Sequence, residues 1–199
     1  MKTQPSHRKS GFTLVELLVV IAIIAVLAGA GFAAGNAAIQ KARRVTALST
    51  AIAIESAVNQ FYSEYGTLPM KTVSAAPFKT TDKDFLKALL GAEGAAASDP
   101  INLRSIKFLS VKEGKKVGTA GTGGLVYDGS EPTGLYDPWG GAYFIVLDDN
   151  YDEILPSVST GQTGSKVVSL NGKRCAVWSE GADAKTKKAS VDDVTTWGQ

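Results

Sequence analysis

A lone carboxylate stands at the beginning of a long apolar stretch. Glu16 is followed by residues 17–40, which contain no charged side chain. A charged side chain at the centre of a bilayer costs roughly 2.5–3.5 kcal/mol, and this cost falls toward the edge. A carboxylate in such a place is stable when a cation lies close to it, or when its side chain reaches the membrane interface in a monomeric anchor. The chemistry that Glu16 offers is therefore charge pairing.

The residues around Glu16 have the composition of a membrane-directed segment. Residues 1–11 carry Lys2, Arg8 and Lys9 and no acidic side chain, which is typical of a segment kept on the cytoplasmic side. Residues 12–32 would rise about 31 Å as a helix, close to the hydrocarbon thickness of a bilayer. This run fits a transmembrane anchor or a cleaved secretory signal with a small-residue site at residues 28–30. A buried core helix fits least, because the run is apolar on every face.

Residues 9–16, Lys-Ser-Gly-Phe-Thr-Leu-Val-Glu, resemble the processing site of type IV prepilins. The resemblance implies that a prepilin peptidase in the membrane cuts between Gly11 and Phe12 and methylates the new amine of Phe12. Glu16 would then be the family's glutamate, and the Phe12 amine of a neighbouring subunit would be its cation. The resemblance covers the N-terminal segment only.

The composition excludes several classes of function. The chain has 21 basic and 19 acidic side chains, and loss of the three basic leader residues would leave 18 against 19, so a nucleic-acid partner is not expected. His7 is the only histidine and lies in the leader, which removes Ser-His-Asp catalysis and His-ligated zinc from the mature chain. Cys175 is the only cysteine, so an intramolecular disulfide cannot form. We therefore expect no enzyme.

A second helical segment follows the apolar run. Residues 36–66 keep helical spacing, and Gly66 with Pro69 ends the pattern. Gly29, Gly31 and Gly35 weaken the helix between the two halves, so we expect bending or melting there on assembly. The predicted apolar stripe consists of Leu48, Ile52, Ile54, Val58, Phe61 and Tyr65.

The rest of the chain predicts a small antiparallel sheet with one short helix. The helix spans residues 81–90, with Thr81 or Asp82 as its N-cap and Gly91 at its end. Strands are expected at residues 106–111 and 142–147, and residues 112–124 form a Lys- and Gly-rich loop. Residues 166–170 and 173–178 would pair as a hairpin across Asn171-Gly172. Residues 148–153 have the first spacings of an EF-hand loop but lack its glycine and its final glutamate, which favours a hairpin turn.

Two segments near the C-terminus extend the resemblance. Residues 136–143, Tyr-Asp-Pro-Trp-Gly-Gly-Ala-Tyr, resemble the D-P-W-G-x-x-Y segment of type II secretion major pseudopilins, and residues 178–183 with 192–197 resemble their C-terminal loop. For Asp137 to Gly140 a tight turn is the preferred interpretation. The family's loop binds calcium, which implies Asp183, Asp192 and Asp193 as Ca²⁺ ligands here. Three lysines stand where that loop is glycine-rich and acidic, so a solvated acidic tail is the alternative: Lys185, Lys187 and Lys188.

These observations predict an α+β, pilin-like fold. We expect a leader at residues 1–11, a transmembrane and filament-core helix at 12–35, an amphipathic continuation at 36–66 and a globular periplasmic domain at 67–199. The resemblance implies a type II secretion pseudopilin in the bacterial inner membrane, assembling with itself, other pseudopilins and inner-membrane secretion components, and contacting prepilin peptidase and lipid. Alternatives are a type IV pilin, a minor pseudopilin, or, from another class, a membrane-tethered enzyme or a secreted binding module.

Overall fold

The computed structural model describes residues 11–72, 74–94, 99–160, 165–183 and 193–198; the side chains of residues 30–34 and 183 lie outside this description. The predicted leader, apart from Gly11, also lies outside it. The chain divides into two compact units, Met1–Lys41 and Ala42–Gln199.

The expected long N-terminal helix is present. Helix α1 runs over Leu14–Tyr65 and includes Gly29, Gly31 and Gly35 without a break, so bending on assembly stays a prediction. Within the first unit, the described side chains of residues 14–29 are all exposed. Among the residues that the structure describes, no helix combines the length and apolar character needed to cross a membrane. The predicted membrane span at residues 12–35 is therefore not confirmed.

The part of α1 in the second unit packs through a face that differs from the predicted stripe. Leu48 and Ile52, which the pattern placed in the core, are 38% and 52% exposed. Ala47 and Ala51 are fully buried instead, because small side chains allow other elements to approach the helix closely. The buried residues follow helical spacing: Ala47, Ala51, Ile54, Ala57, Val58 and Phe61.

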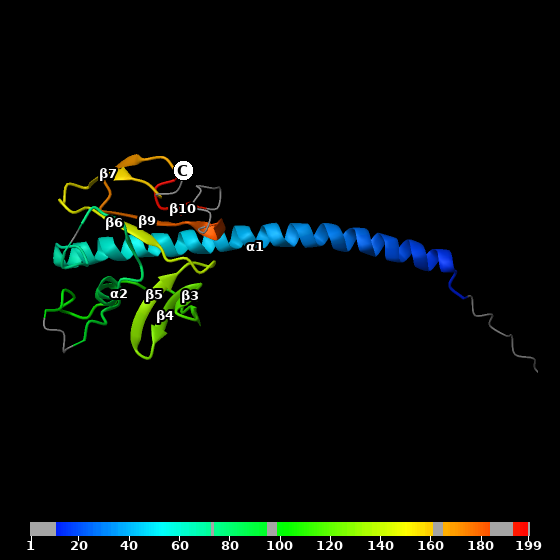
Figure 1. Cartoon of the computed structure of the whole chain (residues 1–199), viewed down its shortest axis with the longest axis horizontal. Coiled ribbons are helices and arrows are strands. Elements are labelled where there is room, and N and C mark those ends of the chain that lie inside the picture. Colours follow the sequence, from blue (N-terminus) through cyan, green and yellow to red (C-terminus); the bar gives the residue numbers. More distant parts are fainter. Residues whose placement is uncertain (1–10, 73, 95–98, 161–164, 184–192, 199) are drawn as a thin grey trace, which may run out of the picture. The chain divides into compact units, whose positions relative to one another are not determined.

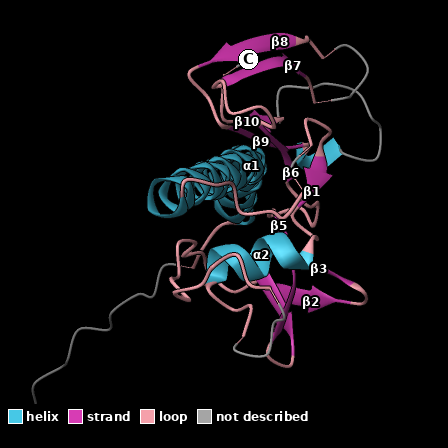
Figure 2. Ribbon diagram, turned by 90° about the vertical axis from the view of Figure 1, so that its left-hand side faces the viewer, coloured by secondary structure: helices cyan, strands magenta, loops and turns pink. Residues whose placement is uncertain are grey.

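A four-stranded antiparallel sheet packs against this part of α1 (Figures 1 and 2). Its order is β1 (Phe78–Lys79), β6 (Phe144–Leu147), β9 (Cys175–Ser179) and β10 (Val194–Thr195). Ile145, Leu147 and Val177 share the core with α1, whereas Val146 and Trp178 belong to a second cluster. The hairpin of β7 (Ile154–Val158) and β8 (Val168–Asn171) covers that second cluster. The sheet is therefore buried on both faces.

The remaining elements lie on the other side of α1 from β7 (Figures 1 and 2). They are α2 (Lys83–Leu90), β2 (Lys115–Val117), β3 (Ala120–Thr122), β4 (Gly124–Asp128) and β5 (Glu131–Tyr136). The short helix is confirmed with its caps: the Asp82 side chain accepts the backbone N–H groups of residues 84 and 85, and Gly91 adopts φ +65°. A single 3₁₀ turn, η1, spans Gly181–Asp183.

Buried Asn102 joins the carboxyl ends of the two α-helices. Its Nδ2 donates to the carbonyl oxygens of Ala88 and Ile106, each at 2.7 Å. Its Oδ1 accepts the Tyr65 hydroxyl at 2.7 Å and the Ile106 N–H at 3.0 Å. One side chain thus satisfies polar groups from α1, from α2 and from the segment that follows α2.

Several strand predictions were wrong. Residues 106–111 form no strand, because Phe108 and Leu109 donate their N–H groups to the Leu89 carbonyl at the end of α2. Residues 112–124 contain the β2–β3 hairpin rather than a loop. Strands β8 and β9 do not pair across Asn171-Gly172, since β6 and β10 occupy both edges of β9 and β8 pairs with β7. Strand β6 is also paired on both edges, with β1 and β9, so residues 148–153 connect β6 to β7 without forming a hairpin.

Candidate functional site

The start of α1 is a reciprocal capping box formed by Thr13 and Glu16. The Thr13 N–H and the Thr13 hydroxyl donate to Glu16 Oε2 at 2.9 and 2.8 Å. The Glu16 N–H donates in return to Thr13 Oγ1 at 3.2 Å. The first residue before a helix and the third residue within it form this arrangement when they are Thr and Glu. The T-x-x-E spacing could have revealed it, but the sequence analysis considered only the charge of Glu16.

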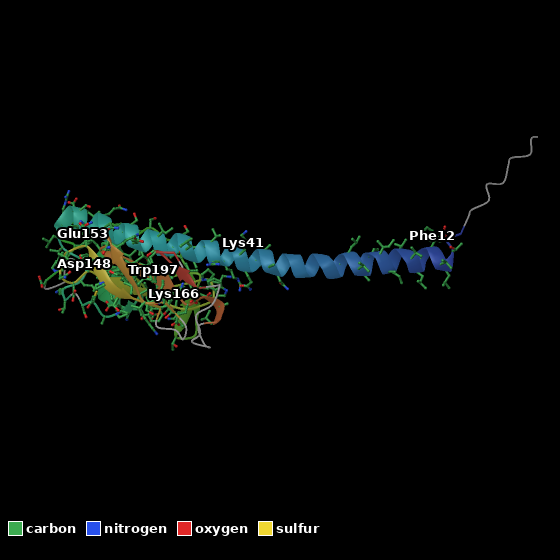
Figure 3. All side chains as sticks on the ribbon, turned by 90° about the horizontal axis from the view of Figure 1, so that it is seen from above. Phe12, Lys41, Asp148, Glu153, Lys166 and Trp197 are labelled. Atoms are coloured by element: carbon green, nitrogen blue, oxygen red, sulfur yellow. The ribbon has the colours of Figure 1, made fainter. Side chains whose placement is uncertain are left out.

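The predicted processing residues lie just before this cap. Gly11 and Phe12 are exposed and have no regular secondary structure, and Figure 3 shows Phe12 at the amino end of α1. A peptidase must draw a peptide bond into its own site, so an exposed bond outside a helix is accessible to it. The structure thus places Gly11, Phe12 and Glu16 within one short segment.

The helix that follows carries a continuous apolar surface within the first unit. Monomeric soluble proteins rarely expose apolar patches of more than a few hundred square ångströms, so such a surface marks a site of interaction with lipid or protein. Its large exposed side chains are Leu14, Val15, Leu17, Leu18, Val19, Val20, Ile21, Ile23, Ile24, Val26 and Leu27.

The three aspartates predicted as calcium ligands are only partly described. Asp193 is almost fully buried, and its backbone carbonyl accepts a hydrogen bond from Arg44 Nη2 of α1 at 3.4 Å. Asp183 ends η1, but its side chain lies outside the description, as does the whole of Asp192 and of residues 184–191. Within the described part of the chain, no three His, Cys, Asp or Glu residues form a group that could hold a metal ion.

Asp137 links the turn between β5 and β6 to the beginning of the C-terminal loop. Its Oδ1 accepts the N–H groups of Trp139 and Gly141, both at 2.9 Å, which confirms the predicted tight turn. Its Oδ2 accepts the Ser179 hydroxyl at 2.5 Å, and Ser179 Oγ accepts the Gly181 N–H at 3.1 Å. Burial raises the pKa of the Asp137 carboxyl, although these hydrogen bonds act in the opposite direction. The sequence predicted the turn but not its connection to Ser179.

A known sequence motif coincides with the segment that contains the start of α1. Residues 6–32 match the model of the prokaryotic N-terminal methylation motif, which contains Gly11, Phe12 and the capping box. The resemblance to type IV pilin-like proteins is confirmed. The chain is 28% identical to the fimbrial protein EcpC of Eikenella corrodens over 122 residues, which is 61% of this chain and 78% of that protein.

A second relative shares a shorter region with this chain. The fimbrial protein of Neisseria meningitidis serogroup A is 35% identical over 74 residues, 37% of this chain and 44% of that protein. The chain thus spans less than half of this relative. No solved structure matches this chain.

Proposed function

We propose that this chain is a structural subunit of a filament, cut after Gly11, methylated at Phe12 and assembled through α1. Before assembly, residues 12–32 hold it in the bacterial inner membrane as a single span, with the globular domain in the periplasm. Within this class we propose the role of a type II secretion pseudopilin, in which growth of a short filament drives protein export. The observation that carries the proposal is the methylation motif at the start of an exposed apolar helix.

The apolar side chains of α1 supply the driving force for assembly. Full burial of one Leu, Ile or Val side chain contributes about 1.5–3 kcal/mol relative to water. Lipid shields these side chains from water in the membrane-held subunit, and neighbouring helices would shield them from water in the filament. Packing and charge pairing, rather than burial alone, then decide between membrane and filament. Glu16 with the Phe12 amine of a neighbour is the pair that favours the filament.

A second exposed apolar stripe lies on α1 within the globular unit. Val45, Leu48 and Ile52 are exposed and follow the spacing of one helix face. The sheet packs on a different face, which contains Ala47 and Ala51. The stripe offers a surface on which the helix of a neighbouring subunit can pack, and it accounts for Leu48 and Ile52 lying outside the core.

Mass spectrometry of the mature N-terminus tests the proposal. Processing by prepilin peptidase gives a methylated Phe12 as the first residue. A chain that starts at Gly31 would identify a secretory signal, and an uncut Met1 would identify a plain anchor; either result overturns the proposal. Electron microscopy of cells that express the full chain with its assembly machinery should then show filaments, and Gly11→Ala should abolish them because the cleavage site is changed.

A type IV pilin is the second candidate, and the names of the two fimbrial relatives favour it. The two candidates differ in the phenotype of a deletion strain. Loss of a pseudopilin leaves proteins that should be secreted in the periplasm. Loss of a pilin instead removes long surface fibres. Measurement of both phenotypes in one strain separates them.

Calcium binding by Asp183, Asp192 and Asp193 remains part of the proposal. A hard cation bound by these oxygens would order the C-terminal loop, and saturation at 100 times Kd stabilises a folded protein by about 2.7 kcal/mol. Ca²⁺ should therefore raise the Tm of the wild type but not that of Asp192→Ala. Asp84→Ala, which changes an exposed aspartate on α2, is the matched control. A wild type that shows no shift would remove calcium from the proposal.

A further inference from the structure

The β2–β3 hairpin presents an apolar and a basic side chain from a fixed backbone. Val117 is 61% exposed, and Lys115 lies two residues before it on the same strand. The hairpin is anchored because Gly121 lies against β4 and β5: a Cβ there would come within 2.4 Å of Val126 Cγ2 and 2.6 Å of Tyr136 Cδ2. The Lys116–Asp128 ion pair, at 2.8 Å, adds a second attachment. Lys115 takes part in none of the ion pairs among the described residues.

The acidic segment, which we define as residues 149–154, follows β6 and ends at the first residue of β7, and it presents the complementary chemistry. Tyr151 is 45% exposed and Ile154 is 41% exposed, and the carboxylates of Asp149 and Asp152 are exposed beside them in the sequence. This segment offers an aromatic ring, an aliphatic side chain and negative charge, whereas the hairpin offers a cation and an aliphatic side chain.

The backbone of residues 149–154 is held in place by several contacts. Asp148 Oδ2 accepts the Glu153 N–H at 2.8 Å, and Asp149 Oδ2 accepts the Ala75 N–H at 3.3 Å. Tyr151 adopts φ +61°, which is unusual for a non-glycine residue. Its ring lies 6.1 Å from the ring of Tyr62 on α1. A fixed segment loses little conformational entropy when a partner binds.

The two surfaces belong to different parts of the globular unit. Figures 1 and 2 both place β7, which begins at the last residue of the acidic segment, and β3 of the hairpin on opposite sides of α1. Figure 3 shows Asp148, which directly precedes the acidic segment, and Glu153, which lies within it, at the end of the unit that contains the carboxyl end of α1. One chain therefore cannot satisfy the hairpin with its own acidic segment.

We propose that the β2–β3 hairpin of one subunit docks on residues 149–154 of the next copy of this chain. The inference rests on the proposed function, since it names a contact within the filament. Two different patches that bind each other form a head-to-tail contact, and such a contact repeats along an open helical filament when the rotation does not close. Lys115 pairs with Asp149 or Asp152 and lies over the Tyr151 ring, while Val117 packs on Ile154.

Cysteine cross-linking in the full chain tests this contact. Lys115→Cys combined with Asp152→Cys should give a ladder of disulfide-linked multimers in filaments, and each single variant should give none. Native Cys175 does not interfere, because it is fully buried and burial raises the pKa of its thiol. Lys107→Cys with Asp152→Cys, which replaces another exposed lysine, is the matched control pair and should not form the ladder.

Charge reversal provides an independent measurement. Lys115→Glu should lower filament yield about fivefold at low salt, and Asp152→Lys in the same chain should restore it. Filaments that form without the cross-linked ladder, or a reversal that its partner does not rescue, would overturn this contact and leave the proposed function intact. A wild-type chain that is processed but never forms filaments would instead overturn the proposed function.

Discussion

Two substitutions separate the helix-capping role of Glu16, seen in the structure, from the charge-pairing role that the proposed filament gives it. Glu16→Gln keeps a side-chain oxygen that can accept the Thr13 N–H, so the capping box survives while the negative charge is lost. Thr13→Ala has the opposite effect, because it removes the hydroxyl from two of the three capping hydrogen bonds and leaves the charge unchanged.

The expected magnitudes differ by more than an order of magnitude. Loss of a Thr cap costs about 1 kcal/mol and frays the first turn, which corresponds to roughly a fivefold change in an equilibrium. Removal of one partner from a buried ion pair leaves the other charge uncompensated. For Glu16→Gln, the Phe12 amine of the neighbour would remain unpaired in the apolar filament interior. The critical concentration for assembly should therefore rise by about 100-fold or more, by the cost of breaking a buried pair.

Sedimentation of filaments from cells that express each full-length variant measures this difference. Mass spectrometry of the membrane fraction must show methylated Phe12 in every variant, so that a loss of filaments reflects assembly rather than processing. The reasoning fails if Glu16→Gln assembles at the wild-type level. It also fails if Thr13→Ala reduces assembly as much as Glu16→Gln, since the cap would then explain the whole effect.

Three further predictions concern the globular unit. Asn102→Ala should lower the free energy of unfolding by about 3 kcal/mol in urea titrations, because it leaves several buried groups unsatisfied; exposed Asn150→Ala should change it by less than about 0.5 kcal/mol. Asp137→Asn should gain stability relative to the wild type as pH rises above about 3.9, the pKa of an unfolded-state aspartate, because the raised folded-state pKa makes the wild type lose stability as this carboxyl ionises. Plots of Tm against pH from 3 to 7 should diverge for the two proteins, and parallel plots would contradict the raised pKa. Gly121→Ala should lower the Tm by several degrees, consistent with a loss of about 1–3 kcal/mol from overpacking against β4 and β5, whereas Gly35→Ala, where a Cβ meets nothing, should not lower it.

The helices could be predicted from the sequence because their signals are local. Asp82 and Gly91 stand next to the turns that they cap, and Gly66 with Pro69 marks the end of α1. The buried face of α1 was predicted less well. A hydrophobicity pattern favours Leu48 over Ala47, but close packing against a sheet favours the smaller side chain.

Strand pairing could not be predicted in the same way. The Asn171-Gly172 signal describes a local turn, whereas the partners of β9 depend on which strands can cover a segment whose five residues are all buried. The β2–β3 hairpin was missed because its residues are mostly Lys, Gly and Thr, which resemble a loop in composition. At the candidate site, the methylation motif could be recognised from local sequence, but the link from Asp137 to Ser179 joins positions far apart in the chain.

The position of β9 in the sequence affects the order in which the protein matures. A ribosome adds roughly 5–20 residues per second, so synthesis of β6, which ends at Leu147, is complete about 1–6 s before the strand that begins at Cys175. Until then the apolar surfaces of β6 lack their neighbour, and the sheet cannot close. In the proposed function, the amino-terminal helix would reach the membrane while the globular unit is still an incomplete chain, and the four-stranded sheet would close only after membrane insertion has begun.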